Sequence, residues 1–265
     1  MAEGAGQAMD VGGLFSIKGK TALITGGSRG IGLMIARGYV DAGVKVYISS
    51  RKKEVCDRVA EELSARGTCL SIPSDISAEA GWTALAEEIK RREKSLDILV
   101  NNAGATWGAT LEEFPDSGFD RVFNLNVKAM FMLTRELMPL LERAATPEDP
   151  ARVINIGSVD GLTVPLPDNF SYSASKAAVH HMTRVLASKL GEKNITVNAV
   201  APGPFESKMT EWMLENFGEA IAARCPLTRI GRPEDMAGIA IYLASRAGSY
   251  LTGTVIPVDG GISAK

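Results

Sequence analysis

The sequence has few cysteines, few aromatic residues and no long hydrophobic run. Its 265 residues include 3 cysteines and 2 histidines. Cys56, Cys69 and Cys225 lie far apart, without the spacing of metal ligands, which is typical of reduced thiols rather than of a disulfide framework. No apolar run approaches the ~20 residues of a membrane-spanning helix. We therefore expect a cytoplasmic protein without a structural metal or a membrane segment.

The charge of the chain is nearly balanced. A net charge of −2, with 45% hydrophobic and 23% charged residues, is ordinary for a globular protein. It provides no broad positive field for nucleic acid or an anionic bilayer. Residues 1–13 lack the basic and apolar segments of a secretory signal, and we expect them to form a flexible arm. Residues 14–265 show no break in composition and are predicted to form one domain.

Short β-branched runs alternate with longer helical patterns along this domain. Strands are predicted at 21–25, 44–50, 68–74, 96–100, 152–156, 195–200 and 254–258. Helices are predicted at 30–42, 52–66, 78–92, 118–144, 170–191 and 233–246. Such alternation requires right-handed crossovers. The sequence therefore predicts an α/β, Rossmann-type doubly wound fold, in which helices flank a seven-stranded parallel sheet.

Two segments interrupt the alternation. Residues 157–169 follow the fifth strand, and a long connection at 203–232 follows the sixth. Ligands of open α/β sheets bind beyond the carboxyl ends of the strands. We therefore expect both segments to overhang a ligand site, the second as a lid.

A glycine-rich loop joins the first strand to the first helix of the sheet. Its sequence is TGGSRGIG at 25–32. Glycines permit a tight turn and let a pyrophosphate approach the N–H groups of the following helix. The spacing G-x-x-x-G-x-G differs from the G-x-G-x-x-G fingerprint, and a simple turn is the alternative. The position after the first strand favours a dinucleotide site.

The end of the second strand indicates which nicotinamide cofactor binds. NAD sites usually carry an acidic residue there, whereas this chain has Ser50 and Arg51, and its first acid is Glu54 inside the next helix. Arginine offers a planar fork for a 2′-phosphate, and Arg29 in the glycine-rich loop can approach the same group. A solvated basic cluster is the alternative. The sequence predicts NADP(H).

Four polar residues form a catalytic pattern. Tyr172 and Lys176 lie four apart on one helix face, Ser158 ends the fifth strand, and Asn126 lies in the preceding helix. Each alone is more often a packed or solvated residue. In order, however, TGGSRGIG, NNAG at 101–104, Asn126, Ser158, Tyr172-x-x-x-Lys176 and Pro202-Gly203 resemble the short-chain dehydrogenase/reductase family over nearly the whole chain. One more residue separates Ser158 from Tyr172 than is common in that family.

The resemblance implies roles for these residues. Tyr172 exchanges a proton with the substrate oxygen, Ser158 bonds that oxygen, and Asn126 holds a water that links Lys176 to solvent. Lys176 lowers the tyrosine pKa, ordinarily ~10, and bonds the nicotinamide ribose. The cofactor-binding set comprises Gly26, Ser28, Arg29, Gly30, Ile31, Gly32, Ser50, Arg51, Asp75, Ile76, Asn102, Ala103, Gly104, Tyr172, Lys176, Pro202, Gly203 and Ser207. For Asp75 and Ser207, loop capping is the alternative.

The family also implies subunit pairing. The stripe of Met130, Phe131, Leu133, Leu137 and Met138 and the run Ala177-Ala178-Val179 would form a homodimer interface and, with the last helix and strand, a homotetramer. Core packing is the alternative. His180 and His181 have no metal-ligand partner at helical spacing, and we expect them at a surface or an interface.

The lid sequence suggests the substrate. Met209, Trp212, Met213 and Phe217 recur near helical spacing, and Trp107 could join the same apolar wall, which suits a hydrophobic ketone. The alternative is that they only pack the lid onto the domain. The motifs INIGSV, NAVAPG and TGTVIPVDGG resemble β-ketoacyl reductases, including those of rhamnolipid synthesis.

We therefore expect reduction of a carbonyl substrate, such as an acyl thioester, with NADPH. Lys193 could face an acidic carrier protein, but Asp149 would oppose it, so a coenzyme A thioester is equally compatible. The alternatives are a sugar-acid, polyol or sterol dehydrogenase and a catalytically silent NADPH-binding sensor.

Overall fold

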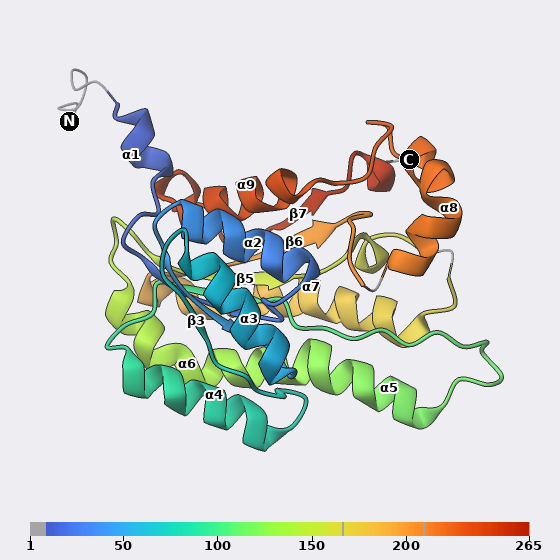
Figure 1. Ribbon diagram of the computed structural model, residues 1–265, viewed down its shortest axis with the longest axis horizontal. Helices are drawn as coiled ribbons and strands as arrows, with labels where there is room; N and C mark the ends of the chain where they lie inside the picture. Colours follow the sequence, from blue (N-terminus) through green and yellow to red (C-terminus); the bar gives the residue numbers. More distant parts are fainter. Residues whose placement is uncertain (1–8, 166, 209, 265) are drawn as a thin grey trace.

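The computed structural model describes residues 9–165, 167–208 and 210–264, and its centre is a seven-stranded sheet (Figure 1). The strand order is β3-β2-β1-β4-β5-β6-β7, and every neighbouring pair is parallel. This confirms the predicted doubly wound fold. The strands are β1 (Thr21–Thr25), β2 (Lys45–Ser49), β3 (Cys69–Ser71), β4 (Ile98–Asn101), β5 (Ala151–Ile156), β6 (Ile195–Pro202) and β7 (Val255–Val258).

Helices cover both faces of the sheet (Figure 1). One face packs against α2 (Gly30–Asp41), α3 (Lys53–Ser64) and α9 (Pro233–Ala244). The other packs against α4 (Glu79–Arg92), α6 (Met130–Ala144) and α7 (Phe170–Leu190). Side chains alternate between the faces: Ile24 of β1 lies in the first core and Leu23 in the second. Burial on both faces explains why the strands are continuous apolar runs.

The predicted helix 118–144 is three elements in the structure. It begins as α5 (Asp116–Phe123), widens into the π-helix η1 (Asn124–Ala129) and continues as α6. Its apolar periodicity hides the change of helix type, and Asn126 lies in the widened turn. π-Helical turns often occur at functional sites.

The remaining elements are a short N-terminal helix, a helix in the predicted lid segment and several short turns. Of the predicted arm, residues 1–8 lie outside the described part, whereas Val11–Phe15 form the short helix α1, capped by Asp10, whose Oδ1 accepts the Gly13 N–H at 3.0 Å. The helix α8 (Glu211–Arg224) lies in the predicted lid segment. The remaining short turns are η2 (Val159–Gly161), η3 (Gly191–Lys193), η4 (Arg246–Gly248) and η5 (Ile262–Ala264).

The polar segments of interest gather where the parallel strands end. The order of strands reverses direction between β1 and β4, which is where such folds bind ligands. In Figure 1, α8 lies at this carboxyl edge of the sheet. Within the described residues, no helix is long and apolar enough to cross a membrane.

Candidate active site

The glycine-rich loop is clamped to the end of β4 by Asn102. The Asn102 Nδ2 atom donates to the carbonyl oxygens of Thr25 at 2.8 Å and Gly26 at 3.2 Å. The Thr25 hydroxyl oxygen accepts the N–H groups of Asn102 and Ala103, both at 3.0 Å. Gly26 has a φ of 66°, and a Cβ on Gly32 would lie 2.4 Å from the Asn102 amide. Only glycine fits these two positions, so the sequence of the glycine-rich loop determines how closely it packs against Asn102.

The end of β2 carries two hydroxyl groups without partners. The Oγ atoms of Ser49 and Ser50 are buried and have no hydrogen-bond partner among the described residues. Buried polar atoms of this kind need an explanation, such as a ligand. Arg51 directly follows Ser50, Arg29 lies in the glycine-rich loop, and both are exposed, while the first carboxylate is Glu54 in α3. An adenosine ribose with a 2′-phosphate, as in NADP(H), fits this region, because it offers two free hydroxyls and two cations and has no acid at the strand end.

Ser158, Tyr172 and Lys176 are brought together between β5 and α7. Their local elements differ: Ser158 follows β5 and precedes η2, whereas the other two lie one turn apart in α7. The Ser158 side chain lies close enough to Tyr172 to lower the pKa of its hydroxyl. The Lys176 Nζ atom lies 5.5 Å from the centre of the Tyr172 ring and donates to the Ile156 carbonyl at 2.7 Å. The predicted three-residue cluster exists as a spatial unit.

The pKa of Tyr172 differs in direction from the sequence prediction. Burial raises it to about 12, the hydrogen bond from Ser158 opposes this, and the Asp160 charge adds to it. Lys176 does not contribute to this shift of the Tyr172 pKa. Its own pKa falls to about 8 because burial disfavours the ammonium, with Asp160 opposing. The hydroxyl is therefore held protonated at neutral pH, which suits a proton donor.

Asn126 is buried and its amide is used by the protein. Its Oδ1 atom accepts the Ala105 N–H at 2.8 Å, and its Nδ2 atom donates to the Ala105 carbonyl at 3.0 Å and to Ser175 Oγ at 2.9 Å. Asn126 thus fixes the turn after β4 against α7. A Cβ on Gly104 would lie 3.3 Å from Asn126 Oδ1 and 3.8 Å from Lys176 Nζ, so the three residues meet. The water relay stays a prediction.

The remaining predicted cofactor residues lie around the same edge. Asp75 is exposed and its Oδ1 atom accepts the Ser77 N–H at 3.1 Å, while Ile76 is buried in the core. Pro202 ends β6. Ser207 packs on the glycine-rich loop, where a Cβ on Gly30 would lie 3.1 Å from its own Cβ.

Both Asp75 and Ser207 also cap local turns. Ser207 Oγ lies 3.0 Å from Thr210 Oγ1. Capping is therefore present, and their cofactor contacts stay predictions.

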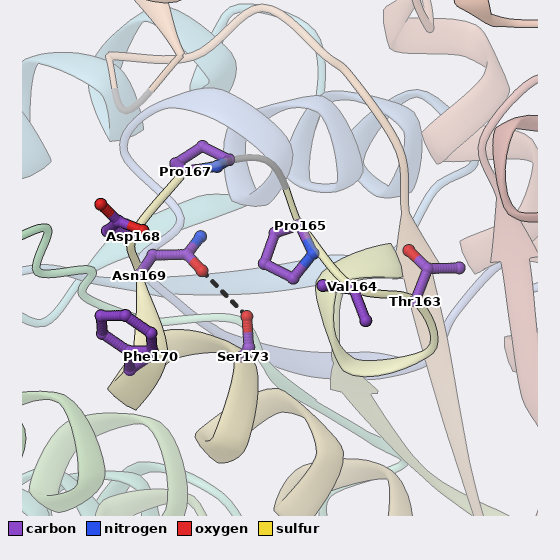
Figure 2. Close-up of a pocket in the computed structure, with 8 residues that line it drawn as sticks. All are labelled: Thr163, Val164, Pro165, Pro167, Asp168, Asn169, Phe170 and Ser173. Atoms are coloured by element: carbon purple, nitrogen blue, oxygen red, sulfur yellow. Dashed lines mark hydrogen bonds between the residues drawn. The ribbon is translucent and has the colours of Figure 1, made fainter. Parts of the chain in front are cut away.

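A hollow of about 420 Å³ lies beside the start of α7 (Figure 2). Asn169 and Ser173, both at the start of α7, point toward one another on one side of it, and their side chains are hydrogen bonded at 2.9 Å. The apolar part of its lining is Val164, Pro165, Pro167 and Phe170. Tyr172, the predicted proton donor, precedes Ser173 in the same helical turn, so this apolar surface lies near the predicted reacting group.

The lid helix α8 exposes its aromatic side chains. Trp212 is 68% exposed and Phe217 is 53% exposed, and their rings contact each other edge to face at 5.8 Å. Packing onto the domain therefore does not explain these two residues. Met209 lies outside the described residues. Trp107 does not join them: it packs on α5, where a Cβ on Gly118 would lie 2.9 Å from its ring.

Comparison with known proteins identifies the family. A family model described as enoyl-(acyl carrier protein) reductase matches residues 26–263. The chain belongs to the short-chain dehydrogenase/reductase family. It is 50% identical to the rhamnolipids biosynthesis 3-oxoacyl-(acyl-carrier-protein) reductase of Pseudomonas aeruginosa, covering 93% of this chain and 97% of that one. It is 35% identical to a gluconate 5-dehydrogenase of Gluconobacter oxydans, covering 94% and 97%.

Solved structures agree with this assignment. The Pseudomonas aeruginosa RhlG/NADP active-site complex superposes with a TM-score of 0.92 at 49% identity, covering 95% of this chain and 99% of that one. A gluconate 5-dehydrogenase of Burkholderia cenocepacia in complex with NADP and tartrate superposes with a TM-score of 0.88 at 30% identity, covering 96% and 98%. This chain is thus an oxidoreductase of the same fold.

Sequence reasoning missed two residues of this dehydrogenase/reductase site. His180, expected at a surface or an interface, is buried, and its Nε2 atom accepts the Ser158 N–H at 3.5 Å. Asp160 lies two residues after Ser158, and its N–H donates to Ser158 Oγ at 3.1 Å. The only sequence signal for either was proximity to Ser158 and Tyr172, because both contacts depend on how β5 and α7 pack.

Proposed function

We propose that this protein is an NADPH-dependent reductase that converts the ketone of a β-ketoacyl thioester, or of a similar hydrophobic compound, to a secondary alcohol. The observation that carries this proposal is the grouping of Ser158, Tyr172 and Lys176 at one place between β5 and α7. The 3-oxoacyl reductase named among the relatives supports a carbonyl substrate.

The residues of the site divide the chemistry among them. Bound NADPH supplies the hydride. The hydroxyls of Ser158 and Tyr172 both hydrogen bond to the substrate oxygen, which orients the carbonyl and stabilises the charge that develops on it. Tyr172 then gives its proton to that oxygen. Because its pKa is about 12, the proton is present at neutral pH, which favours reduction over oxidation. Lys176 contributes a positive charge and bonds the nicotinamide ribose.

Apolar surface near the reacting residues supports an acyl substrate. The hollow lined by Val164, Pro165 and Phe170 and the exposed rings of Trp212 and Phe217 offer contacts to a hydrocarbon chain. The gluconate 5-dehydrogenases among the relatives make oxidation of a sugar acid the second candidate. Such a substrate would gain little from the apolar part of these surfaces.

The carrier of the acyl group is proposed to be small. Lys193 already pairs with Glu142, and Asp149 pairs with Lys20 and with Arg152. Lys193 is thus already paired with a carboxylate, and Asp149 contributes a negative charge. Together they attract an acidic carrier protein only weakly. A coenzyme A thioester or a free ketone meets no such cost.

Assembly and compartment are also proposals. Three residues of the apolar stripe in α6 are buried in the core, as the core-packing alternative predicts: Met130, Leu133 and Leu137. Val185 of α7 is 42% exposed, and Phe131 and Met138 are half-buried, which supports pairing of subunits through α6 and α7 as a homodimer or homotetramer. The three cysteines are buried, and Cys56 and Cys69 are free thiols, which supports a reducing compartment such as the cytoplasm.

A substrate panel tests the proposal. NADPH oxidation is followed with acetoacetyl thioesters and longer β-ketoacyl thioesters, and NADP reduction with gluconate and polyols. We expect kcat/KM to be highest for a thioester and to rise with chain length. Faster turnover of a sugar acid or polyol than of every thioester would contradict the acyl substrate.

A further inference from the structure

Asp160 is a carboxylate held rigidly beside the catalytic residues. Its Oδ2 atom accepts a hydrogen bond from Asn169 Nδ2 at 3.0 Å, and Asn169 Oδ1 accepts one from Ser173 Oγ at 2.9 Å. Asn169 is itself buried. The side chain of Asp160 is therefore fixed by the first turn of α7, the same turn that carries Tyr172.

The carboxylate lies close to the place of the substrate carbonyl. The Asp160 N–H donates to Ser158 Oγ at 3.1 Å, and an aspartate carboxylate reaches only about 4 Å from its own nitrogen. Its oxygens are thus within roughly 7 Å of the Ser158 hydroxyl. Asp160 acts electrostatically on both Tyr172 and Lys176.

The charge of Asp160 is not cancelled by an ion pair. Among the ion pairs of the described residues, none involves Asp160. Burial raises the pKa of Asp160, and the Asn169 hydrogen bond and the charge of Lys176 oppose this shift. Lys176 is the cation that opposes it within the site, and Lys176 donates to the Ile156 carbonyl rather than to Asp160.

We propose that Asp160 is a specificity-determining residue, which selects neutral ketones and rejects substrates that carry a carboxylate next to the reacting carbonyl. This rests on the proposed function and narrows its substrate class. A carboxylate one or two carbons from the carbonyl would lie roughly 8–12 Å from the Asp160 oxygens, because the hydrogen bond from Ser158 to the carbonyl oxygen adds about 3 Å. At an effective dielectric constant of about 20, such a pair disfavours binding by roughly ten- to thirtyfold. Esters and thioesters lack that charge, whereas sugar acids and free β-keto acids have it.

The test uses two substrates that differ in charge and share the same ketone, methyl acetoacetate and acetoacetate. The ratio of their kcat/KM values is measured with NADPH for the wild type and for Asp160→Asn, which keeps an oxygen for the Asn169 N–H. The matched control is Asp120→Asn, which removes a charge from an exposed residue of α5 that does not line the hollow. We expect the neutral-to-anion ratio to fall about tenfold or more in Asp160→Asn and to stay at the wild-type value in the control.

The result that would overturn the role of Asp160 differs from the result that would overturn the proposed function. An unchanged ratio in Asp160→Asn, or an equal change in both variants, would overturn the role of Asp160. If Asp160→Asn does not fold, Asp160→Ala carries the same expectation for the ratio. Failure of the proposed function shows separately, as absent turnover of β-ketoacyl thioesters by the wild type, because the ratio is measured on simple ketones.

Discussion

The Lys176 ammonium donates to the main-chain oxygen of Ile156, two residues before Ser158, at 2.7 Å. This bond joins α7 to the last residue of β5 and brings the lysine into a buried environment, which lowers its pKa to about 8. The position of Lys176 is thereby coupled to the strand that leads to Ser158, so two of the predicted catalytic residues are positioned together.

The first prediction follows from that pKa. A lysine with a pKa of about 8 is charged below that pH and loses its proton above it, whereas Tyr172, with a pKa of about 12, stays protonated. We expect kcat/KM for ketone reduction to be level near neutrality and to fall above about pH 8. A pH profile measured with saturating NADPH checks this. A profile that rises through this range would show that Lys176 is not needed as a cation.

The second prediction concerns the tyrosine. Tyr172→Phe removes the hydroxyl that Ser158 contacts and leaves the ring in place, so folding and NADPH binding should survive. General acid–base catalysis is worth ~10²–10⁴-fold, and kcat should fall by that factor. Tyr250→Phe, at a fully exposed residue, is the control and should turn over normally. Near-normal kcat in Tyr172→Phe would remove this residue from the mechanism.

The third prediction concerns the cofactor. Charge-assisted hydrogen bonds contribute ~1.5–3 kcal/mol, so Arg51→Asp should weaken NADPH binding by roughly ten- to a hundredfold and shift preference toward NADH. Arg58→Asp makes the same charge change at an exposed residue further along α3 and should leave the preference intact. Binding is measured by cofactor fluorescence. A wild type that prefers NADH would contradict the assignment of NADP(H).

The sequence predicted the sheet well because its strands are apolar runs that are buried on both faces. It could not predict the π-helical turn at Asn126, since the apolar periodicity of 118–144 continues through it. His180 was misplaced for a related reason: a histidine without a metal partner gives no local signal, and its contact with Ser158 spans 22 residues. The direction of the Tyr172 pKa was wrong because burial, a tertiary property, raises it.

The fourth prediction tests the cradle for the cofactor. A Cβ at Gly32 would lie 2.4 Å from both Asn102 Nδ2 and the Gly26 carbonyl oxygen. Overpacking of this kind typically costs 1–3 kcal/mol, so Gly32→Ala should lower Tm and weaken NADPH binding. Gly238→Ala in α9, where a Cβ meets nothing within 4 Å, should retain both or gain stability. Equal behaviour of the two variants would mean that Asn102 does not constrain the loop.

The fifth prediction concerns stability in acid. Burial lowers the pKa of His180 from 6.5 to about 4 in the folded protein. Between these values the unfolded chain binds a proton that the folded chain does not, so the free energy of unfolding should fall as the pH drops. The slope is at most about 1.4 kcal/mol per pH unit. His180→Gln cannot titrate and should show a shallower loss in urea unfolding. Identical slopes for both proteins would contradict the burial of a neutral histidine.

The central claim is that the hydride of NADPH reaches the β-carbonyl carbon of an acyl thioester. The most direct measurement uses NADPH deuterated at the transferable position of C4 with an acetoacetyl thioester, followed by mass spectrometry of the product. We predict a 3-hydroxybutyryl thioester with a single deuterium on the carbon that bears the hydroxyl group. A product without deuterium at that carbon would contradict this claim. Turnover of an enoyl thioester, with deuterium added across its carbon–carbon double bond, and no turnover of the acetoacetyl thioester would also contradict it.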